Sequence, residues 1–414
     1  MKRRTVILSA VTLILLTAWP ASSFAGEGWT TFRQGPERLN KSLDSNLMGT
    51  WPDGGPKLLW HAKGLGGGYA TATVAADGTV YTAGDTAGKL HLFAINSDGE
   101  RIWDVAIDNA WTKGPRDWHG ARSTPTLDDG KVYVVSAYGK LGCYKAADGS
   151  ELWTVSLPRT FGAKVPNWGY AESPLIHGDL CIVAPGGRSA AIAALNKDSG
   201  ETVWKSPPFG GAQYGSNTLA KVGDVEMVVN GMHNGLLAVN AANGELLWTN
   251  GFAKGNTANC PTPVCSDGYV FWAVGYGKGA VCVKVEPDGD GVKATEVYRT
   301  KEMVNHHGGY VIDNGYVYGN HGGEYVCLDL QTGRKQWQIK GPGKGSTTWA
   351  DGMLILYGER GGKVQLVAAT SDEPTTAGAF GVDGSGPSWA HPVVVNGKLY
   401  LRYGENLYCF QVGK

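Results

Sequence analysis

The sequence has no excess of charge of either sign. Its 414 residues contain 37 lysines and arginines against 37 aspartates and glutamates. Proteins that bind nucleic acids or anionic membranes through electrostatics carry a basic surface, and this composition supplies none. We therefore expect no nucleic-acid partner.

Familiar catalytic motifs are also missing. The chain has no Gly-x-Ser-x-Gly nucleophile elbow, no His-Glu-x-x-His zinc motif, no phosphate-binding P-loop and no dinucleotide-binding glycine fingerprint. No Cys-x-x-Cys occurs, so the sequence gives no sign of structural zinc. These absences argue against nucleophilic hydrolysis and against nucleotide-dependent chemistry.

The apolar run at the N-terminus, residues 6–16, is too short to span a bilayer. It follows three basic residues at positions 2–4 and precedes the small-residue end Ser23–Ala25, which is the pattern of a secretory signal. We assign residues 1–25 to a cleaved signal peptide. We expect a periplasmic or secreted protein with no transmembrane segment after cleavage, in which residues 26–414 form one domain.

Glycine is abundant instead, at 62 of 414 residues, and it recurs with a period. A tight glycine turn followed by an apolar strand returns every 37 to 52 residues, which is the period of a four-stranded propeller blade. The eight glycines are Gly78, Gly130, Gly178, Gly223, Gly268, Gly315, Gly352 and Gly397.

A second glycine turn follows in most repeats and leads to an aromatic residue. Asp-Gly and Asn-Gly pairs suit two-residue hairpins, so each repeat is interpreted as four short strands. The aromatic residue is expected to pack between blades. These residues are Trp103, Trp153, Trp204, Trp248 and Trp337, with Tyr298 in a degenerate copy and Trp60 before the first repeat.

The two ends of the chain complement each other. The last repeat stops at residues 407–412 without a closing aromatic strand, whereas residues 57–60 form such a strand with no blade before it. We therefore predict an all-β fold, an eight-bladed β-propeller of four-stranded antiparallel blades. Its N-terminal strand completes the C-terminal blade and removes the open sheet edges.

The seven cysteines follow the repeat rather than a disulfide pattern. Cys143 and Cys327 occupy equivalent points of core strands on different blades, where they are expected to act as small apolar residues. Cys260 and Cys265 are close in sequence, but one strand would hold them too far apart to bond without a bend. Whether this pair is bonded stays open at the level of sequence.

The connections between blades, together with those between the second and third strands, must lie on one face of the ring, and the short glycine turns on the other. Polar residues gather on the long-loop face, near the central channel. Convergent charges in a concavity predict a binding site, although polar residues at strand starts also satisfy free backbone groups. The candidate residues are Arg122, Glu172, Asn217, Asn259, His306, His307, Lys344, Glu359, Arg360, Trp389 and His391.

Two features of this set bear on chemistry. His306 and His307 suggest a metal, with Glu172 or His391 as further ligands, but neighbouring residues on a strand point to opposite sides. We therefore expect one histidine at most to face the channel. Trp389 lies outside the repeat register, as do Trp111, Trp118, Trp168 and Trp349, and these residues are free to stack on a flat ligand.

The repeat around Cys327, from Tyr325 to Trp337, resembles that of quinoprotein alcohol dehydrogenases, the pyrroloquinoline quinone (PQQ) type of propeller. The resemblance covers essentially the whole mature chain. Segments such as Arg122-Ser-Thr-Pro and Asn305-His-His-Gly-Gly are similar to those of small exported bacterial members of this family. The family also includes an outer-membrane assembly lipoprotein that has no cofactor.

The resemblance implies two alternative functions. One is an exported module that binds a small polar ligand, or an envelope protein or peptide, on the long-loop face, with no cofactor. The other is a reduced-size PQQ- and calcium-dependent alcohol or sugar dehydrogenase, with the quinone over Trp389 and Glu172 and Asn259 as calcium ligands. The chain departs from the dehydrogenases because it lacks their adjacent cysteine pair and an obvious aspartate base.

Overall fold

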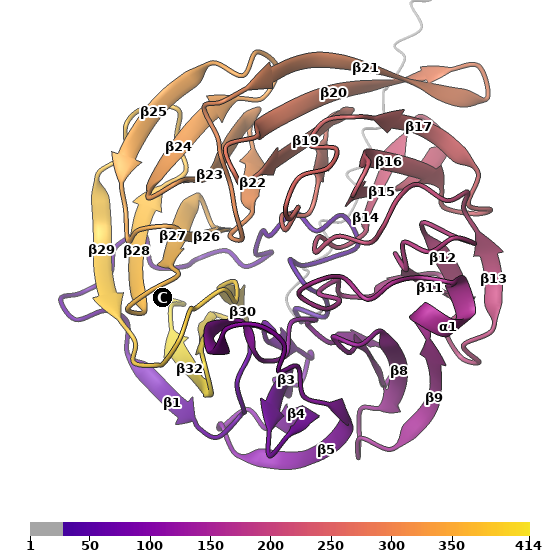
Figure 1. Cartoon of the computed structure of the whole chain (residues 1–414). Helices are drawn as coiled ribbons and strands as arrows, with labels where there is room; N and C mark the ends of the chain where they lie inside the picture. The colour runs from indigo at the N-terminus through magenta and orange to yellow at the C-terminus, as the bar shows by residue number, and fades with distance from the viewer. Residues whose placement is uncertain (1–27) are drawn as a thin grey trace, which may run out of the picture.

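The computed structural model describes residues 28–414, in which eight four-stranded antiparallel sheets form a closed ring (Figure 1). Each sheet is one blade, with its first strand beside the channel and its fourth strand at the rim. The predicted eight-bladed propeller is confirmed. The proposed signal peptide, residues 1–25, lies outside the described residues.

The strands follow one another blade by blade. Blade 1 contains β2 (Thr73–Val74), β3 (Val80–Thr86), β4 (Lys89–Ile95) and β5 (Arg101–Asn109). Blade 2 contains β6 (Thr126–Asp128), β7 (Lys131–Val135), β8 (Lys140–Lys145) and β9 (Glu151–Ser156). Blade 3 contains β10 (Leu175–His177), β11 (Leu180–Val183), β12 (Ala193–Asn196) and β13 (Thr202–Lys205). Blade 4 contains β14 (Thr218–Val222), β15 (Val225–Met232), β16 (Gly235–Asn240) and β17 (Leu246–Asn250).

The second half of the ring continues in the same way. Blade 5 contains β18 (Val264–Ser266), β19 (Tyr269–Val274), β20 (Gly279–Asp288) and β21 (Gly291–Thr300). Blade 6 contains β22 (Tyr310–Asp313), β23 (Tyr316–His321), β24 (Glu324–Asp329) and β25 (Lys335–Lys340). Blade 7 contains β26 (Gly345–Ala350), β27 (Met353–Gly358), β28 (Lys363–Ala368) and β29 (Thr376–Gly381). Blade 8 contains β30 (Val393–Val395), β31 (Lys398–Tyr403), β32 (Asn406–Gln411) and β1 (Leu58–Ala62).

The two turns of a blade are built differently. All eight glycines of the first turn have positive φ, and in five blades the preceding Asp or Asn does too, as two-residue hairpins require. In the second turn, around Gly99 for example, Asp98 keeps an ordinary φ and the ladder bulges between Ala94 and Ile95. The expected two-residue hairpin is therefore wrong for the second turn, which is longer and carries a β-bulge.

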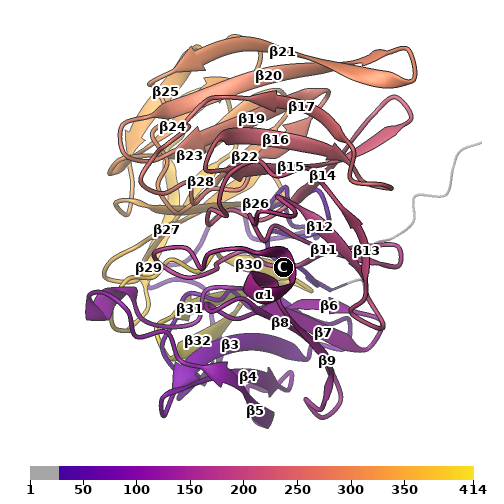
Figure 2. The same cartoon turned by 45° about the vertical axis from the view of Figure 1, so that its right-hand side comes forward.

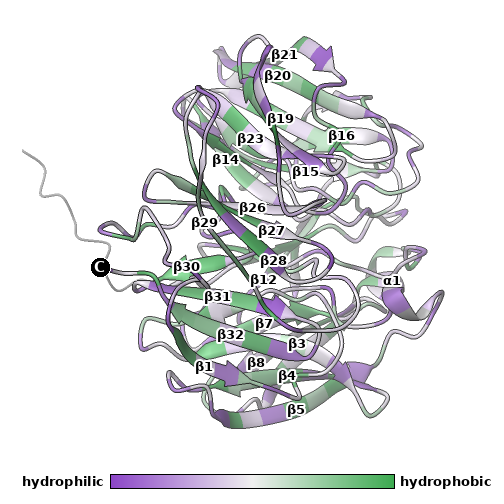
Figure 3. Ribbon diagram, turned by 90° about the vertical axis from the view of Figure 1, so that its left-hand side faces the viewer, coloured by the Kyte–Doolittle hydropathy of each residue, from purple (hydrophilic) through white to green (hydrophobic). Residues whose placement is uncertain are grey.

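The core consists of eight apolar layers, each between two neighbouring blades. Figure 3 shows the strands β30, β31 and β32 as largely hydrophobic.

Within the described residues no helix is long and apolar enough to cross a membrane. The short segments α1 (Leu157–Phe161) and η1 (Arg116–Trp118) belong to loops between blades. Figure 2 shows the turn between β20 and β21 extending from one side of the ring.

In six outer strands an aromatic residue donates a hydrogen bond to the next blade and so joins two blades, whereas the indole N–H of Trp248 has no partner among the residues described. The indole N–H of Trp103 in β5 donates to the carbonyl of Ala146 in blade 2, and Gly149 there leaves no room for a Cβ, which would lie 2.9 Å from the indole. The same hydrogen bond to the next blade recurs for Trp60, Trp153, Trp204, Tyr298 and Trp337. The repeating Gly and Trp signals are thus two halves of one contact.

The ring closes as predicted. The strand β1 pairs antiparallel with β32, with Trp60 opposite Cys409 and Ala62 opposite Leu407. The N-terminal strand thereby becomes the outer strand of the blade that ends the chain. The pairing covers the edge of β32, which would otherwise be open.

The segment before β1, residues 28–48, runs through the central channel, and sequence analysis did not foresee it. It forms isolated β-bridges with three blades, at Val74, Trp349 and Gly413. Figure 1 shows this indigo segment crossing the middle of the ring. It is therefore a stopper made from the chain's own N-terminal residues.

Two arginines fix the stopper, and both are fully buried. The Arg38 side chain donates to the carbonyls of Asn217, Ser173 and Pro174, at 2.5, 2.8 and 3.0 Å. Arg33 donates to the carbonyl of Tyr310. Burial lowers the pKa of Arg38 to about 9 and that of Arg33 to about 10, so both stay charged at neutral pH.

All seven cysteines, which lie within the described residues, are free. Cys143 and Cys327 are buried, as expected for small core residues. Cys260 and Cys265 form no disulfide, which answers the question that the sequence left open.

Two shortened chains separate the stopper from the closing strand. A chain that begins at residue 52 keeps β1, and we expect it to melt cooperatively at a lower temperature than the parent. A chain that begins at residue 63 lacks the outer strand of blade 8, and we expect its cooperative transition to be lost. Differential scanning calorimetry of both chains checks this, and near-parental cooperative melting of the shorter chain would contradict the closure.

Arg38→Met tests the stopper within the full chain. The substitution leaves buried carbonyls without donors, so we expect the free energy of unfolding to fall by about 3 to 5 kcal/mol. Urea unfolding followed by fluorescence measures this. Arg334→Met, at an exposed turn, is the matched control and is expected to change stability by no more than about 0.5 kcal/mol. Equal stabilities of the two variants would refute the anchoring role of Arg38.

Candidate functional site

A belt of hydrogen bonds links the starts of the innermost strands around much of the channel. In each link a backbone N–H donates to a hydroxyl oxygen of the next blade, over 2.9 to 3.1 Å. The links run from His391 to Thr71, Thr71 to Thr124, Thr124 to Ser173, Ser173 to Ser216 and Ser216 to Thr262. The belt fixes where five side chains of the site begin, because each lies two residues before a belt residue: Tyr69, Arg122, Tyr214, Cys260 and Trp389.

A cavity of about 340 Å³ opens above this belt, on the predicted long-loop face. Its walls come from all eight blades and its floor includes Phe32 of the stopper. The lining residues are Phe32, Tyr69, Trp118, Arg122, Trp168, Ala171, Ser173, Tyr214, Ala258, Cys260, Tyr276, His306, His307, Lys344, Glu359, Arg360, Trp389 and His391. The stopper makes the site a closed cup rather than an open tunnel.

One wall of the cavity is a continuous band of rings. Tyr69 packs on Trp389 with centroids 4.4 Å apart, Trp389 on His307 at 4.3 Å, and His307 on His306 at 3.7 Å. Tyr276 and His306 then meet nearly at right angles, with centroids 4.7 Å apart. Such a band offers a broad apolar surface with few internal degrees of freedom.

A second group of rings lies on the opposite part of the lining. Trp118 meets Trp168 edge-on at 5.8 Å, and Trp168 meets Tyr214 at 5.7 Å. Trp118 is the most accessible of these, with 37% of its surface exposed. Sequence analysis singled out both tryptophans as free to stack, and the structure brings them to the cavity.

Glu359 organises the polar part of the band. Its carboxylate accepts a hydrogen bond from the Trp389 indole N–H at 2.9 Å and lies 3.2 Å from the Lys344 ammonium. Burial alone would raise the pKa of Glu359, but the neighbouring His307, Trp389 and Lys344 outweigh burial and lower it to about 2. The carboxylate is therefore ionised, and it fixes the orientation of Trp389.

Arg122 is held in place from several sides. Its guanidinium donates to the carbonyls of Gly120, at 2.5 Å, and Trp118, and it lies over the rings of Tyr69 and Trp111. These contacts place a fixed positive charge in the wall. Arg360 is different, because its side chain is 71% exposed near the mouth of the cavity.

The expectation that one histidine at most faces the channel is wrong. Both His306 and His307 line the cavity, because they lie in a bend before β22 and not in a strand. Alternation of side chains applies only to extended strands. Burial lowers the pKa of His307 and brings that of His306 to about 3, so both imidazoles are neutral at neutral pH.

Three of the predicted site residues lie elsewhere. Glu172 is 1% exposed and accepts a hydrogen bond from the Ala184 backbone N–H at 2.9 Å. Asn217 accepts from Asn230 at 2.8 Å, and Asn259 donates to the carbonyl of Met232. None of the three lines the cavity, and they satisfy polar groups between neighbouring strands instead. The other eight predicted residues are all in the lining.

Several lining residues were not predicted from sequence. Phe32 comes from the stopper, while Tyr69, Tyr214 and Tyr276 come from loops between strands. Tyr69 and Tyr214 occupy the same place as Arg122, shortly before an innermost strand, so that position was the available signal. Cys260 was considered only as a disulfide partner.

Comparison with known proteins assigns the repeat. A family model described as outer membrane protein assembly factor BamB matches residues 88–339. The chain belongs to this family of PQQ-like propellers. The match spans more than half of the chain and agrees with the resemblance seen in the repeats.

Two characterised relatives of the family differ in kind. The chain is 28% identical to a quinoprotein ethanol dehydrogenase of Pseudomonas aeruginosa over 232 residues, which are 49% of this chain and 36% of that protein. It is 24% identical to the outer membrane protein assembly factor BamB of Shewanella oneidensis, over 68% of this chain and 71% of that protein. The chain thus matches only about a third of the dehydrogenase's length.

A solved structure shares the fold. BamB from Moraxella catarrhalis superposes with a TM-score of 0.64 at 17% identity, over 86% of this chain and 99% of that chain. At this identity the likeness shows the propeller architecture alone.

The residues in the cavity do not fit PQQ and calcium. Glu172 and Asn259, the oxygen ligands suggested by the family resemblance, are buried outside the cavity and engaged by other groups. Both Tyr69 and His307 pack against Trp389, where the quinone would stack. Among the described lining residues Glu359 is the one carboxylate, and it is paired with Lys344.

The burial of Glu172 predicts a pH dependence of stability. Burial raises its pKa to about 8, with the Ala184 hydrogen bond and Arg38 opposing in part. The folded state then holds a proton that the unfolded state releases above its ordinary pKa. Stability from this residue is present below about pH 4.5 and is lost as pH rises through about 8.

Glu172→Gln should remove this slope while keeping an acceptor for Ala184. As the pH rises from 5 to 8, the free energy of unfolding of the parent should fall by about 1 to 3 kcal/mol more than that of the variant. Urea unfolding at several pH values measures it, with the exposed Glu245→Gln as control. Parallel pH profiles for parent and Glu172→Gln would be the contrary result.

Proposed function

We propose that this chain is an exported envelope protein whose cavity binds a small ligand with an anionic group and a flat apolar face. The observation that carries the proposal is the composition of the cavity wall. Aromatic rings line it together with three cationic side chains, Arg122, Lys344 and Arg360, against the single carboxylate Glu359. The neutral histidines leave an excess of positive charge.

The depth of the site favours a small molecule. The stopper closes the channel below Phe32, and a volume of about 340 Å³ is within the range of small-molecule sites. The two ring groups, around Trp118 and around Trp389, provide surfaces on which a planar ring or the apolar face of a sugar packs. An aromatic carboxylate and an acidic sugar share this chemistry.

The three cationic side chains differ in how far they are free to contact an anionic group. Arg122 is occupied by two carbonyls, so it contributes mainly a fixed charge. Lys344 shares its charge with Glu359, while Arg360 at the mouth lies 3.9 Å from Asp117. A ligand carboxylate would compete for Lys344 and Arg360, and hydrogen bonds between charged groups are worth about 1.5 to 3 kcal/mol.

Family membership favours a second candidate function, docking of an envelope protein or peptide. The family description and the Shewanella oneidensis relative are both named as outer membrane assembly factors. On this chain a peptide would use the same face, with an acidic side chain in the cavity and Trp118 at its edge. Binding of an acidic peptide but of no small anion would favour this candidate.

Export rests on the N-terminal sequence. The basic residues 2–4 and the apolar run that follows support cleavage after about residue 25 and release into the periplasm or medium. Residues 26–414 would then form the mature single-domain propeller.

A titration of the metal-free protein tests the small-ligand proposal. We expect benzoate-type anions or uronic acids to change tryptophan fluorescence saturably, and the corresponding amides or neutral sugars to bind at least tenfold more weakly. Lys344→Gln should weaken binding of the best anion about tenfold, because one charged contact is lost.

The control variant is Lys254→Gln, at an exposed lysine between blades 4 and 5 that is outside the cavity lining. It should bind the anion as the parent does. Equal affinity for the anion and its neutral counterpart, or equal losses in the two lysine variants, would overturn the proposal.

A further inference from the structure

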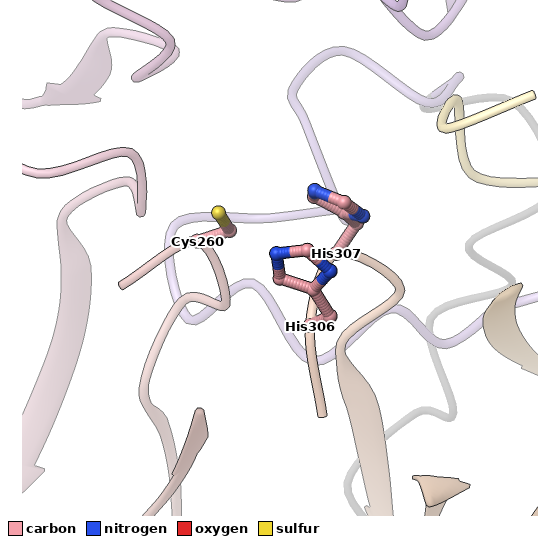
Figure 4. Close-up of side chains that lie close together, drawn as sticks. All are labelled: Cys260, His306 and His307. Atoms are coloured by element: carbon pink, nitrogen blue, oxygen red, sulfur yellow. The ribbon is translucent and has the colours of Figure 1, made fainter. Parts of the chain in front are cut away.

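Three potential metal ligands meet in the wall of the cavity. Cys260 precedes the first strand of blade 5, and His306 with His307 precedes the first strand of blade 6. One ligand atom of each residue lies within 4.8 Å of the others. Figure 4 shows the sulfur of Cys260 on the side to which one ring nitrogen of each histidine points. The cluster is assembled by two neighbouring blades.

Each histidine has a buried ring nitrogen without a hydrogen bond to the described residues, and that of His307 lies on the side of Glu359. Within the described part of the chain, Nε2 of His306 and Nδ1 of His307 are buried and have no hydrogen-bond partner. A buried polar atom without a partner costs about 1 to 3 kcal/mol, so it calls for a physical explanation. Cys260 is a free thiol. Each of the three residues can therefore supply a ligand atom without losing a hydrogen bond or a disulfide.

Neighbouring residues confine the cluster. Tyr276 meets the face or edge of His306, and Trp389 packs on the other side of His307. Glu359 lies 3.6 Å from Nδ1 of His307, beyond hydrogen-bond distance, and anchors the Trp389 indole. These contacts restrict the imidazoles to small rotations, which lowers the entropy lost when they bind an ion.

We propose that Cys260, His306 and His307 bind one late first-row transition-metal ion, with a fourth position open to the cavity. A thiolate and two imidazoles are ligands that suit copper and zinc, whereas calcium and magnesium prefer oxygen. Ligand atoms around such an ion stand roughly 3.5 Å apart, so the side chains must close by about 1 Å from their present spread. The Cys260 thiol gives up its proton to solvent as the metal–sulfur bond forms.

The site goes beyond the anion-binding function and stands independently of it. A bound ion would add positive charge to the wall that holds Lys344, and its open position faces the space where an anion would lie. Copper(II) is expected to bind more tightly than zinc, following the general order of divalent affinities.

Cobalt(II) is the spectroscopic probe for the test. The full mature chain is treated with a chelator, dialysed and titrated with Co²⁺. We expect one equivalent to bind with thiolate-to-cobalt charge-transfer absorption, and Zn²⁺ to displace it, while Ca²⁺ and Mg²⁺ do not. Absence of a saturable one-equivalent signal, together with no binding of Zn²⁺ or Cu²⁺ in equilibrium dialysis, would overturn the proposal.

Matched variants locate the ion. Cys260→Ser should abolish the charge-transfer band, and His306→Gln or His307→Gln should weaken Co²⁺ binding at least tenfold. Cys265→Ser is the control, because this free cysteine is outside the cluster, and it should bind as the parent does. A band that survives in Cys260→Ser would refute the site.

A measurement on the unmodified chain covers the case in which a variant fails to fold. Zn²⁺ should slow alkylation of Cys260 by iodoacetamide at least tenfold, as followed by mass spectrometry of its peptide. The alkylation rate of Cys265 should not change. Equal rates at Cys260 with and without Zn²⁺ would contradict the proposal. Anion binding is measured separately in chelator, so failure of either proposal leaves the other standing.

Discussion

The belt of backbone-to-hydroxyl hydrogen bonds around the channel is the constraint on which the site depends. In each link a blade offers a free N–H at the start of its first strand, and the next blade supplies a serine or threonine oxygen, as between Ser173 and Ser216. The tryptophan contacts at the rim, such as Trp103 to Ala146, fix the same blades at their outer edge. Blade 8 and blades 1 to 5 are linked in this way beside the channel, and the residues before their first strands therefore keep fixed positions.

The stopper turns this rigid ring into a cup. The side chains of Arg38 and Arg33 donate hydrogen bonds to backbone carbonyls at the inner strands. The stopper that these bonds hold closes the channel beneath Phe32. Above the floor, Glu359 holds Trp389 and Lys344, and Arg122 is fixed by carbonyls and rings. The cavity is therefore preformed, so a molecule that bound there would not have to order the walls.

The sequence predicts the ring well because its signals are local. Gly130 and its equivalents are needed because the backbone there has a positive φ. Trp153 and its equivalents are needed because each packs on a glycine turn of the next blade. Both residue types therefore recur visibly in the sequence. The sequence of the stopper does not repeat. Its arginines donate to backbone carbonyls, which every residue has, so no residue type in the blades marks these contacts. Glu172 and His306 both precede an innermost strand, yet one turns to the backbone and the other to the cavity. His306 lies four residues before Tyr310, the same place that Arg122 holds before Thr126, whereas Glu172 lies three residues before Leu175, so their register to the strand separates them.

The central claim is that the cup binds a flat anion between its two ring groups. A crystal structure of the protein with the tightest-binding anion from the fluorescence titration tests this most directly. We expect the planar part between Trp118 and Trp389, with the anionic group at Lys344 or Arg360. Density for the ligand outside the cup, with the rings around Trp389 unchanged and solvent above Phe32, would contradict it.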